Sequence, residues 1–200
     1  MSARLAVLVS GGGRSLENLV ERSRRGELAA EVVLAIADRP AIGALERCAR
    51  LGVPALVIDY KEAGGVEGFS ARVFRELDER GVRLCVLAGF LRLVRVPPAW
   101  RGRVLNIHPA LLPKYGGKGY YGDRVHAAVL AAGERESGCT VHHVDDHYDH
   151  GAHVLQKRVP VLPGDDVHSL AARVFEAETQ ALPEAIELVL AKLAAAARTP

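Results

Sequence analysis

The stretch VLVSGGGRSLENL, residues 7–19, joins an apolar run to a segment of helical character through three consecutive glycines. The apolar run, Leu5–Val9, is short and has no polar residue, as expected for a strand that is buried on both faces. The segment that follows repeats its apolar residues at helical spacing, which predicts a helix over Ser15–Arg25. A buried strand, a glycine turn and a helix form the repeating unit of an α/β fold.

The same alternation continues along the chain. Further buried strands are predicted at Val32–Ala37, Pro54–Ile58, Leu84–Ala88 and Arg103–Ile107, with helices at Gly43–Leu51 and Phe69–Arg80. Apolar strands that alternate with helices predict a Rossmann-like, mostly parallel sheet with flanking helices. After His108 we expect a loop over 113–123, a helix over Val125–Ala132, strands that can pair antiparallel at Thr140–Val144 and Val154–Val161, and a helical segment 166–197 broken or kinked near Pro183.

The composition fits one globular domain with an aliphatic core, and we expect a single domain over residues 1–200. The formal charge of +2 is close to neutral and no basic face stands out, which argues against a nucleic-acid partner. No apolar run approaches the roughly 18 residues of a membrane span, and Leu5–Val9 is too short for a signal sequence. Cys48, Cys85 and Cys139 show no paired spacing, so we expect a reduced, cytoplasmic compartment.

The glycine turn is a candidate phosphate-binding site. Glycine lets the backbone approach a phosphate closely, and a helix N-terminus offers free N–H donors with a favourable dipole. An anion could therefore bind the backbone amides of Gly13, Arg14 and Ser15. Leu16 stands where a dinucleotide-binding motif needs its last glycine, and the lysine of a P-loop is absent. A plain strand-to-helix turn capped by Ser15 stays an alternative.

Asn106 and His108 lie at the end of the predicted strand Arg103–Ile107, within VLNIHPALLPKYGGKGYYG (104–122). Side chains two residues apart in a strand point to the same side, so this pair projects from one face. The Asn amide and a protonated His ring can both donate, and together they could stabilise a developing oxyanion. Pro109 favours extended geometry at His108, and ligands of open α/β sheets bind beyond the carboxyl ends of strands. The alternative is an Asn and a His that only cap the loop.

The segment TVHHVDDHYDHGAHVLQ, residues 140–156, holds five histidines and three aspartates. Its spacing matches no standard zinc pattern and contains no HExxH, so we disfavour a metal site. The alternative is a loop that brings one carboxylate against His108, where it would raise the pKa of the ring and hold its tautomer. The chemistry of the segment does not say which aspartate does so.

A family resemblance rests on motifs that occur in one order along the chain. They are VSGGGRSL (9–16), VLAGFLRLV (86–94), LNIHPALLPKY (105–115), GCTVHHVDDHYDHG (138–151) and VLQKRVPVLPGDD (154–166). From about residue 4 to about residue 190 the chain resembles the phosphoribosylglycinamide formyltransferases, or glycinamide ribonucleotide transformylases, of the folate-dependent formyltransferase superfamily. The resemblance implies a formyltransferase fold in which about 1–105 bind the ribonucleotide and about 106–200 provide catalysis and folate binding.

The implied reaction moves a formyl group from 10-formyltetrahydrofolate, a co-substrate, to the amine of glycinamide ribonucleotide in purine biosynthesis. No metal is implied, and a homodimer stays open. The implied catalytic residues are Asn106, His108 and Asp149, with His108 kept protonated by Asp149. The implied substrate-binding residues are Gly13, Arg14, Ser15 and Glu178, and the implied folate-binding residues are Phe90, Leu91, Arg92, Leu93, Val94, Asp145, Asp146, His147 and Tyr148.

The chain departs from the family pattern at two places. Arg14 and Ser15 stand where the family often has Ser-Asn, and Tyr120 and Tyr121 stand where many members have a histidine. The second departure puts the substrate contacts of the 116–123 loop in doubt.

Other functions use part of the same pattern. A 10-formyltetrahydrofolate hydrolase has the same motifs with water as acceptor, but it usually carries an N-terminal regulatory domain, and this chain begins at the first strand. A methionyl-tRNA formyltransferase would need a further C-terminal domain and a basic surface. A non-catalytic nucleotide-binding module would need only the glycine turn and not Asn106, His108 and Asp149 together.

Overall fold

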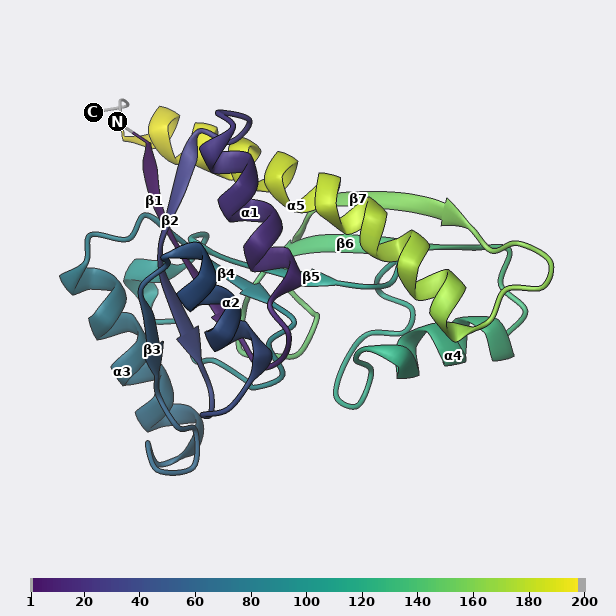
Figure 1. Cartoon of the computed structure of the whole chain (residues 1–200), viewed down its shortest axis with the longest axis horizontal. Coiled ribbons are helices and arrows are strands. Elements are labelled where there is room, and N and C mark those ends of the chain that lie inside the picture. Colours follow the sequence, from purple (N-terminus) through teal and green to yellow (C-terminus); the bar gives the residue numbers. More distant parts are fainter. Residues whose placement is uncertain (1, 198–200) are drawn as a thin grey trace.

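The computed structural model describes residues 2–197, which contain one seven-stranded sheet with helices on both faces (Figure 1). The strands are β1 (Ala3–Val9), β2 (Ala30–Ala37), β3 (Ala55–Val57), β4 (Leu84–Ala88), β5 (Val104–His108), β6 (Glu136–His143) and β7 (His153–Pro160). The helices are α1 (Arg14–Arg24), α2 (Gly43–Leu51), α3 (Gly65–Glu79), α4 (Asp123–Ala131) and α5 (Val167–Ala196), with a short 3-10 helix η1 (Pro98–Trp100). The predicted α/β class with a mostly parallel sheet is confirmed.

The order of strands across the sheet is β3-β2-β1-β4-β5-β6-β7. Neighbours from β3 to β5 pair in parallel, whereas β6 pairs antiparallel with both β5 and β7. Residues of β1 alternate between two buried clusters: Leu5, Val7 and Val9 pack with α1, α2 and α5, and Ala6 and Leu8 pack with α3. Both faces of the parallel part are therefore covered, which explains why its strands show no polar alternation.

The observed bounds differ most from the predicted ones where glycine or polar residues begin an element. The observed β6 begins at Glu136, before the predicted Thr140–Val144, because the buried Ser137 and Gly138 continue the ladder with β7. A Cβ at Gly138 would lie 2.0 Å from the backbone oxygen of Lys157, so this pairing needs glycine. The first residues of β6 are polar or glycine, so the apolar pattern indicates a start that is too late.

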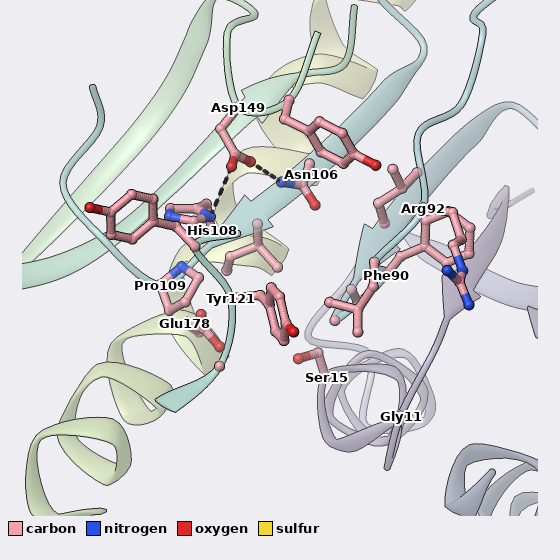
Figure 2. Close-up of a pocket in the computed structure, with 18 of the residues that line it drawn as sticks. Gly11, Ser15, Phe90, Arg92, Asn106, His108, Pro109, Tyr121, Asp149 and Glu178 are labelled. Atoms are coloured by element: carbon pink, nitrogen blue, oxygen red, sulfur yellow. Dashed lines mark hydrogen bonds and ion pairs between the residues drawn. The ribbon is translucent and has the colours of Figure 1, made fainter. Parts of the chain in front are cut away.

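The carboxyl ends of the central strands open onto one cavity. Gly11 and Ser15, which follow β1, face it together with Phe90, which follows β4, and with Asn106 of β5 (Figure 2). Open α/β sheets bind ligands at this position, so the fold places the predicted site residues where a ligand site is expected. None of the helices within residues 2–197 is both long enough and apolar enough to cross a bilayer.

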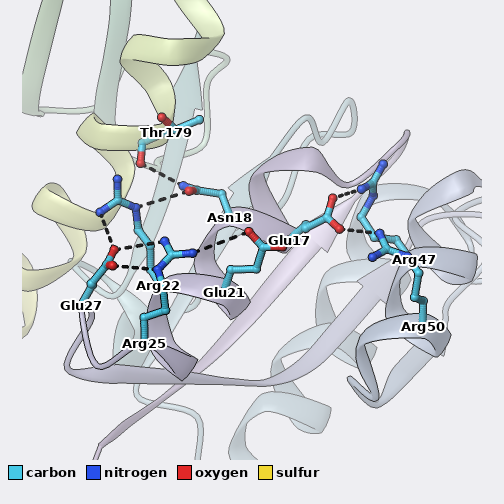
Figure 3. A network of polar contacts seen from close by, with 9 residues as sticks. All are labelled: Glu17, Asn18, Glu21, Arg22, Arg25, Glu27, Arg47, Arg50 and Thr179. Carbon is cyan, nitrogen blue, oxygen red and sulfur yellow. Dashed lines mark hydrogen bonds and ion pairs between the residues drawn. The ribbon is translucent and has the colours of Figure 1, made fainter.

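Helix α5 continues through Pro183, so of the predicted break or kink at this proline the break is wrong and the kink stays a prediction. Proline has no N–H, which leaves the carbonyl of Thr179, one turn earlier, without its helical donor. The side-chain amide of Asn18 on α1 donates to this carbonyl at 2.9 Å (Figure 3). The hydrogen bond that the helix loses is thus replaced by one from a neighbouring helix, and it joins α1 to α5.

We expect Asn18→Ala to lower the free energy of unfolding by about 1–2 kcal/mol, because the Thr179 carbonyl then has no donor. In a Pro183→Ala background, residue 183 can supply the helical N–H itself. The cost of Asn18→Ala should then fall below about 1 kcal/mol.

Denaturant unfolding of the four proteins in this double-mutant cycle measures the difference. Asn18 also accepts a hydrogen bond from Arg22 at 3.3 Å, so Arg22→Ala is the matched control for that second contact. Equal costs of Asn18→Ala in the two backgrounds would contradict this account of Pro183.

Candidate active site

The cavity at the carboxyl ends of β1, β4 and β5 has a volume of about 600 Å³. Its walls come from the glycine turn, from the segment after β4, from the end of β5 with the loop that precedes α4, and from one side of α5. A cavity of this size is typical of a site for a small molecule. It brings together residues that are far apart in the sequence.

The glycine turn presents the first amides of α1 to this cavity. Gly13, the N-cap of α1, has φ 75°, and a Cβ there would lie 2.9 Å from the Cβ of Ala44, so the turn needs glycine. The helix has no side-chain N-cap, so the alternative in which Ser15 caps it is wrong. The amides of the first turn thus stay available to an anion such as a phosphate.

Ion pairs fix the start of α1 against α2. The carboxylate of Glu17 binds both Arg47 and Arg50, and Figure 3 shows the three side chains between the two helices. Nε of Arg47 also donates to the carbonyl of Gly12 at 2.8 Å. The backbone of the turn is therefore held before any ligand binds.

Glu178 of α5 faces the same cavity as Ser15 and Tyr121 (Figure 2). Burial raises the pKa of Glu178 to about 7, although the charge of Arg14 acts to lower it. The guanidinium of Arg14 lies 4.0 Å from the ring centroid of Phe175, one turn before Glu178 on α5. A carboxyl group with this pKa changes its charge near neutral pH.

Asn106 of β5 points at the carboxylate of Asp149 (Figure 2). Its Nδ2 donates to Asp149 Oδ1 at 3.2 Å and lies 3.0 Å from Nε2 of His142. Nδ1 of His142 lies 2.8 Å from the carbonyl of His143. Since a carbonyl oxygen can only accept, Nδ1 carries the hydrogen of this bond, and Nε2 accepts from the Asn106 amide. Both hydrogens of the Asn106 amide thus have partners within the site.

His108 lies between Asp149 and the backbone of the following loop. Its Nδ1 is 3.4 Å from Asp149 Oδ2, and its Nε2 donates to the carbonyl of Tyr115 at 2.7 Å. Burial lowers the pKa of His108 below its ordinary value of 6.5 by more than the charge of Asp149 raises it. The expectation that the carboxylate keeps this ring protonated is therefore wrong for the free protein, because the side chain is almost fully buried.

The position of Asp149 depends on an unusual backbone conformation and on hydrogen bonds to its carboxylate. The residue has φ 53°, and its Oδ2 accepts from the N–H of Gly117 at 2.9 Å. Burial acts to raise the pKa of Asp149, but His142, the charge of His108 and the Gly117 N–H together hold that pKa below its ordinary value. The structure thus brings the three predicted catalytic side chains together around an ionised carboxylate.

A formyl transferase family model matches residues 3–186. The chain belongs to the formyl transferase family. The resemblance inferred from the motifs is thereby confirmed, and so is the formyltransferase fold.

Two curated relatives place the chain within the family. It is 43% identical over 191 residues to the trifunctional purine biosynthetic protein adenosine-3 of Drosophila melanogaster, covering 94% of this chain and 14% of that protein. It is 40% identical over 187 residues to the chloroplastic phosphoribosylglycinamide formyltransferase of Vigna unguiculata, covering 92% of this chain and 60% of that one. The chain therefore spans only part of the length of these two relatives.

Solved structures share the fold over nearly their whole length. Glycinamide ribonucleotide transformylase 1 of Geobacillus kaustophilus superposes with a TM-score of 0.85 at 36% identity, covering 95% of this chain and 100% of that one. The enzyme of the same name from Symbiobacterium toebii superposes with a TM-score of 0.84 at 38% identity, covering 92% of this chain and 86% of that one.

The segment that the family resemblance assigns to folate, Phe90 to Val94, lines the cavity in full. It has no helix or strand of its own and is held by side chains. Oγ of Ser10 accepts from the N–H of Leu91 at 3.0 Å, and Arg92 pairs with the buried Asp38 at 2.8 Å. The ring of Phe90 stacks on Phe69 with centroids 5.7 Å apart.

The loop between β6 and β7 divides its predicted folate-binding residues. His147 and Tyr148 line the cavity, whereas Asp145 and Asp146 do not. The carboxylate of Asp145 pairs with His150 at 2.7 Å, and that of Asp146 pairs with Arg95 at 3.6 Å. Local ion pairs turn these two carboxylates away from the cavity.

Two cavity-lining histidines were missed in the sequence. His126 of α4 is buried in the cavity wall, whereas Tyr120 and Tyr121, which stand where the family histidine was expected, are exposed at 41% each. His142 stands opposite Asn106 in the β5–β6 register. A histidine on the apolar face of a predicted helix could have indicated the first, but the second needs the strand pairing.

We expect NMR titration to give His108 a pKa below 6.5 in the free protein, because burial outweighs the charge of Asp149. Asp149→Asn removes the charge that raises this pKa and should lower it further. Asp145→Asn, which removes a carboxylate from the same loop without touching His108, is the matched control and should leave it unchanged. A pKa above 6.5, or equal effects of the two variants, would contradict the geometry.

Proposed function

We propose that the chain transfers the formyl group of 10-formyltetrahydrofolate to the amine of glycinamide ribonucleotide in purine biosynthesis. The relative from Vigna unguiculata and the two solved structures named above carry names of this activity. The observation that carries the proposal is the meeting of Asn106, His108 and Asp149 in one cavity, with the open amides of the α1 turn in the same cavity.

The ribonucleotide would bind with its phosphate on the backbone amides of Gly13, Arg14 and Ser15. These amides have no side-chain cap, and Arg14, which lines the same cavity, adds a positive charge to it. Glu178 faces the same cavity and would accept hydrogen bonds from ribose hydroxyls. In this assignment most ribonucleotide contacts come from residues of about 1–105, and the catalytic groups come from about 106–200.

The co-substrate would bind against the segment Phe90–Val94, with His147 and Tyr148 beside it. Apolar side chains of this segment suit a flat heterocycle, and its backbone groups could pair with the polar edge of such a ring. When bound there, 10-formyltetrahydrofolate supplies the formyl group. Asp145 and Asp146 would then act through the loop rather than by direct contact, because their carboxylates have other partners.

The catalytic groups would stabilise the negative charge that forms when the substrate amine attacks the formyl carbon. Both hydrogens of the Asn106 amide have partners in the free site, so the developing oxyanion must replace one of them. The neutral ring of His108 keeps its proton on Nε2, and the lone pair of Nδ1 faces Asp149. Nδ1 can therefore receive the proton of the attacking amine, and the imidazolium that forms stabilises the oxyanion.

Asp149 has two tasks in this scheme. Its negative charge stabilises the imidazolium once His108 has taken up a proton. When the intermediate collapses, a water bound to Asp149 would help to pass this proton from His108 to the departing folate nitrogen. A proton lost by the amine thus ends on the leaving group, and the enzyme returns to its starting state.

The hydrolase and the non-catalytic binding module are the alternatives. Tetrahydrofolate absorbance followed with and without glycinamide ribonucleotide separates them. Folate release that needs the ribonucleotide supports the transferase, release without it supports the hydrolase, and no folate chemistry supports the binding module.

We also propose a cytoplasmic location. Its support is that Cys48, Cys85 and Cys139 are free and buried, as in proteins of a reducing compartment. The homodimer stays a prediction.

We expect Asn106→Ala and His108→Ala each to lower kcat by about 10²–10³, because each removes one group that stabilises the oxyanion. The fold should stay intact, which circular dichroism and thermal unfolding would check. His168→Ala, at an exposed position of α5, is the control. Turnover of either site variant close to that of the control would refute the assigned roles.

We expect the KM for the ribonucleotide to fall as pH rises through about 7, because Glu178 then ionises and becomes a better acceptor for ribose hydroxyls. Glu178→Gln should raise this KM and flatten its pH dependence, and the KM for the folate should not follow. Ionisation of the substrate phosphate affects both proteins equally, so the difference between their profiles isolates Glu178. Identical profiles would count against the ribose contact.

A further inference from the structure

The loop between β6 and β7 gathers imidazole and carboxylate groups in a part of the chain without positive side chains. Residues 136–156 contain five histidines and three aspartates but no lysine or arginine. Among the residues that the structure describes, Asp145, His147 and His150 are the one group of this kind whose ligand atoms all lie within 4.8 Å of one another. The proposed reaction uses none of these three in its chemistry.

The carboxylate of Asp145 is already oriented between the two imidazoles. Its Oδ1 accepts from the backbone N–H of His147 at 2.8 Å, and its Oδ2 lies 2.7 Å from Nδ1 of His150. Nδ1 of His147 lies 4.0 Å from Oδ1. Within the described residues 2–197, the ion-pair partners of this carboxylate are these two histidines alone, so no arginine or lysine competes for it.

The two imidazoles face each other and are open to solvent. Their ring centroids are 5.4 Å apart in an edge-to-face arrangement. The side chains of His147 and His150 are 76% and 72% exposed, so water can complete the coordination of an ion held by three protein ligands. An ion approaching from solvent meets two nitrogen atoms and one carboxylate oxygen.

We propose that Asp145, His147 and His150 bind one divalent transition-metal ion, with Zn²⁺ as the best match. Two imidazole nitrogens and a carboxylate oxygen suit Zn²⁺, whereas Mg²⁺ and Ca²⁺ prefer oxygen ligands alone. Tetrahedral bonds of about 2.1 Å place ligand atoms about 3.4 Å apart. Rotation of these exposed side chains can bring the ligand atoms from their observed separation to this distance. The ion then takes the place of the hydrogen between Asp145 and His150.

This ion has no part in formyl transfer. Asp149 lies in the chain between His147 and His150, and His147 lines the cavity. A bound ion would therefore stabilise the turn that carries the Asp149 carboxylate. Binding of the ion does not depend on the proposed reaction, and it can be measured without either substrate.

The test uses untagged full-length protein freed of metal by a chelator and titrated with ZnCl₂ alone in a calorimeter. We expect one ion per chain. Asp145→Asn and His150→Ala should each lower the affinity for Zn²⁺ at least about tenfold. Loss of a residue that only supports a ligand already lowers metal affinity by about this factor, and these two residues are themselves ligands. Co²⁺ should give visible absorption bands that these two variants lose.

The matched controls are His153→Ala, from the same histidine-rich segment, and His168→Ala, from α5, both at exposed positions. They should bind Zn²⁺ as the unmodified protein does. No binding by the unmodified protein overturns the proposal. So does equal affinity in all five proteins, which would mean that the ion binds elsewhere or only adventitiously. A failure of the formyl transfer assay would leave this result unaffected.

Discussion

The antiparallel pairing of β6 with β5 is the constraint on which the site depends. In this register Asn106 stands opposite His142 and His108 stands opposite Thr140. The Thr140 hydroxyl donates to the carbonyl of Ala110 at 2.7 Å and accepts from the N–H of Leu112 at 3.1 Å, which fixes the backbone after His108. A parallel β6 would run the other way beside β5 and would place other side chains opposite Asn106 and His108.

The chain leaves β6 at the edge of the sheet where β5 begins, and the loop that follows turns back and brings Asp149 onto the same two side chains. One buried carboxylate then has contacts with Asn106, His142, His108 and the Gly117 N–H. Burial disfavours the charged form of both His108 and Asp149, but the outcome differs between the two. Burial lowers the pKa of the histidine, whereas the contacts of the carboxylate keep Asp149 ionised. The result is a site with a stable negative charge beside a ring that is ready to accept a proton.

Much of this arrangement could be predicted from the sequence because it depends on local rules. Continuous apolar strands indicated a sheet covered on both faces, and the i, i+2 spacing of Asn106 and His108 placed both side chains on one side. The pKa shift of His108 could not be predicted, because its direction depends on a burial that only the folded loop creates. The choice among Asp145, Asp146 and Asp149 required the family resemblance, since these residues are equivalent as chemistry and differ only in where the loop turns.

His142 could not be assigned to the site from the sequence. Its place opposite Asn106 follows from the strand register, which the pattern of apolar residues does not give. The continuity of α5 through Pro183 was missed for a similar reason, because the donor that replaces the missing N–H lies on α1, more than a hundred residues away in sequence.

That contact between Asn18 and the Thr179 carbonyl has an evolutionary consequence. The side-chain amide at position 18 replaces a missing helical hydrogen bond only while residue 183 is proline. Across relatives, substitutions at these two positions should therefore occur together, although the two residues lie on different helices and neither one takes part in chemistry.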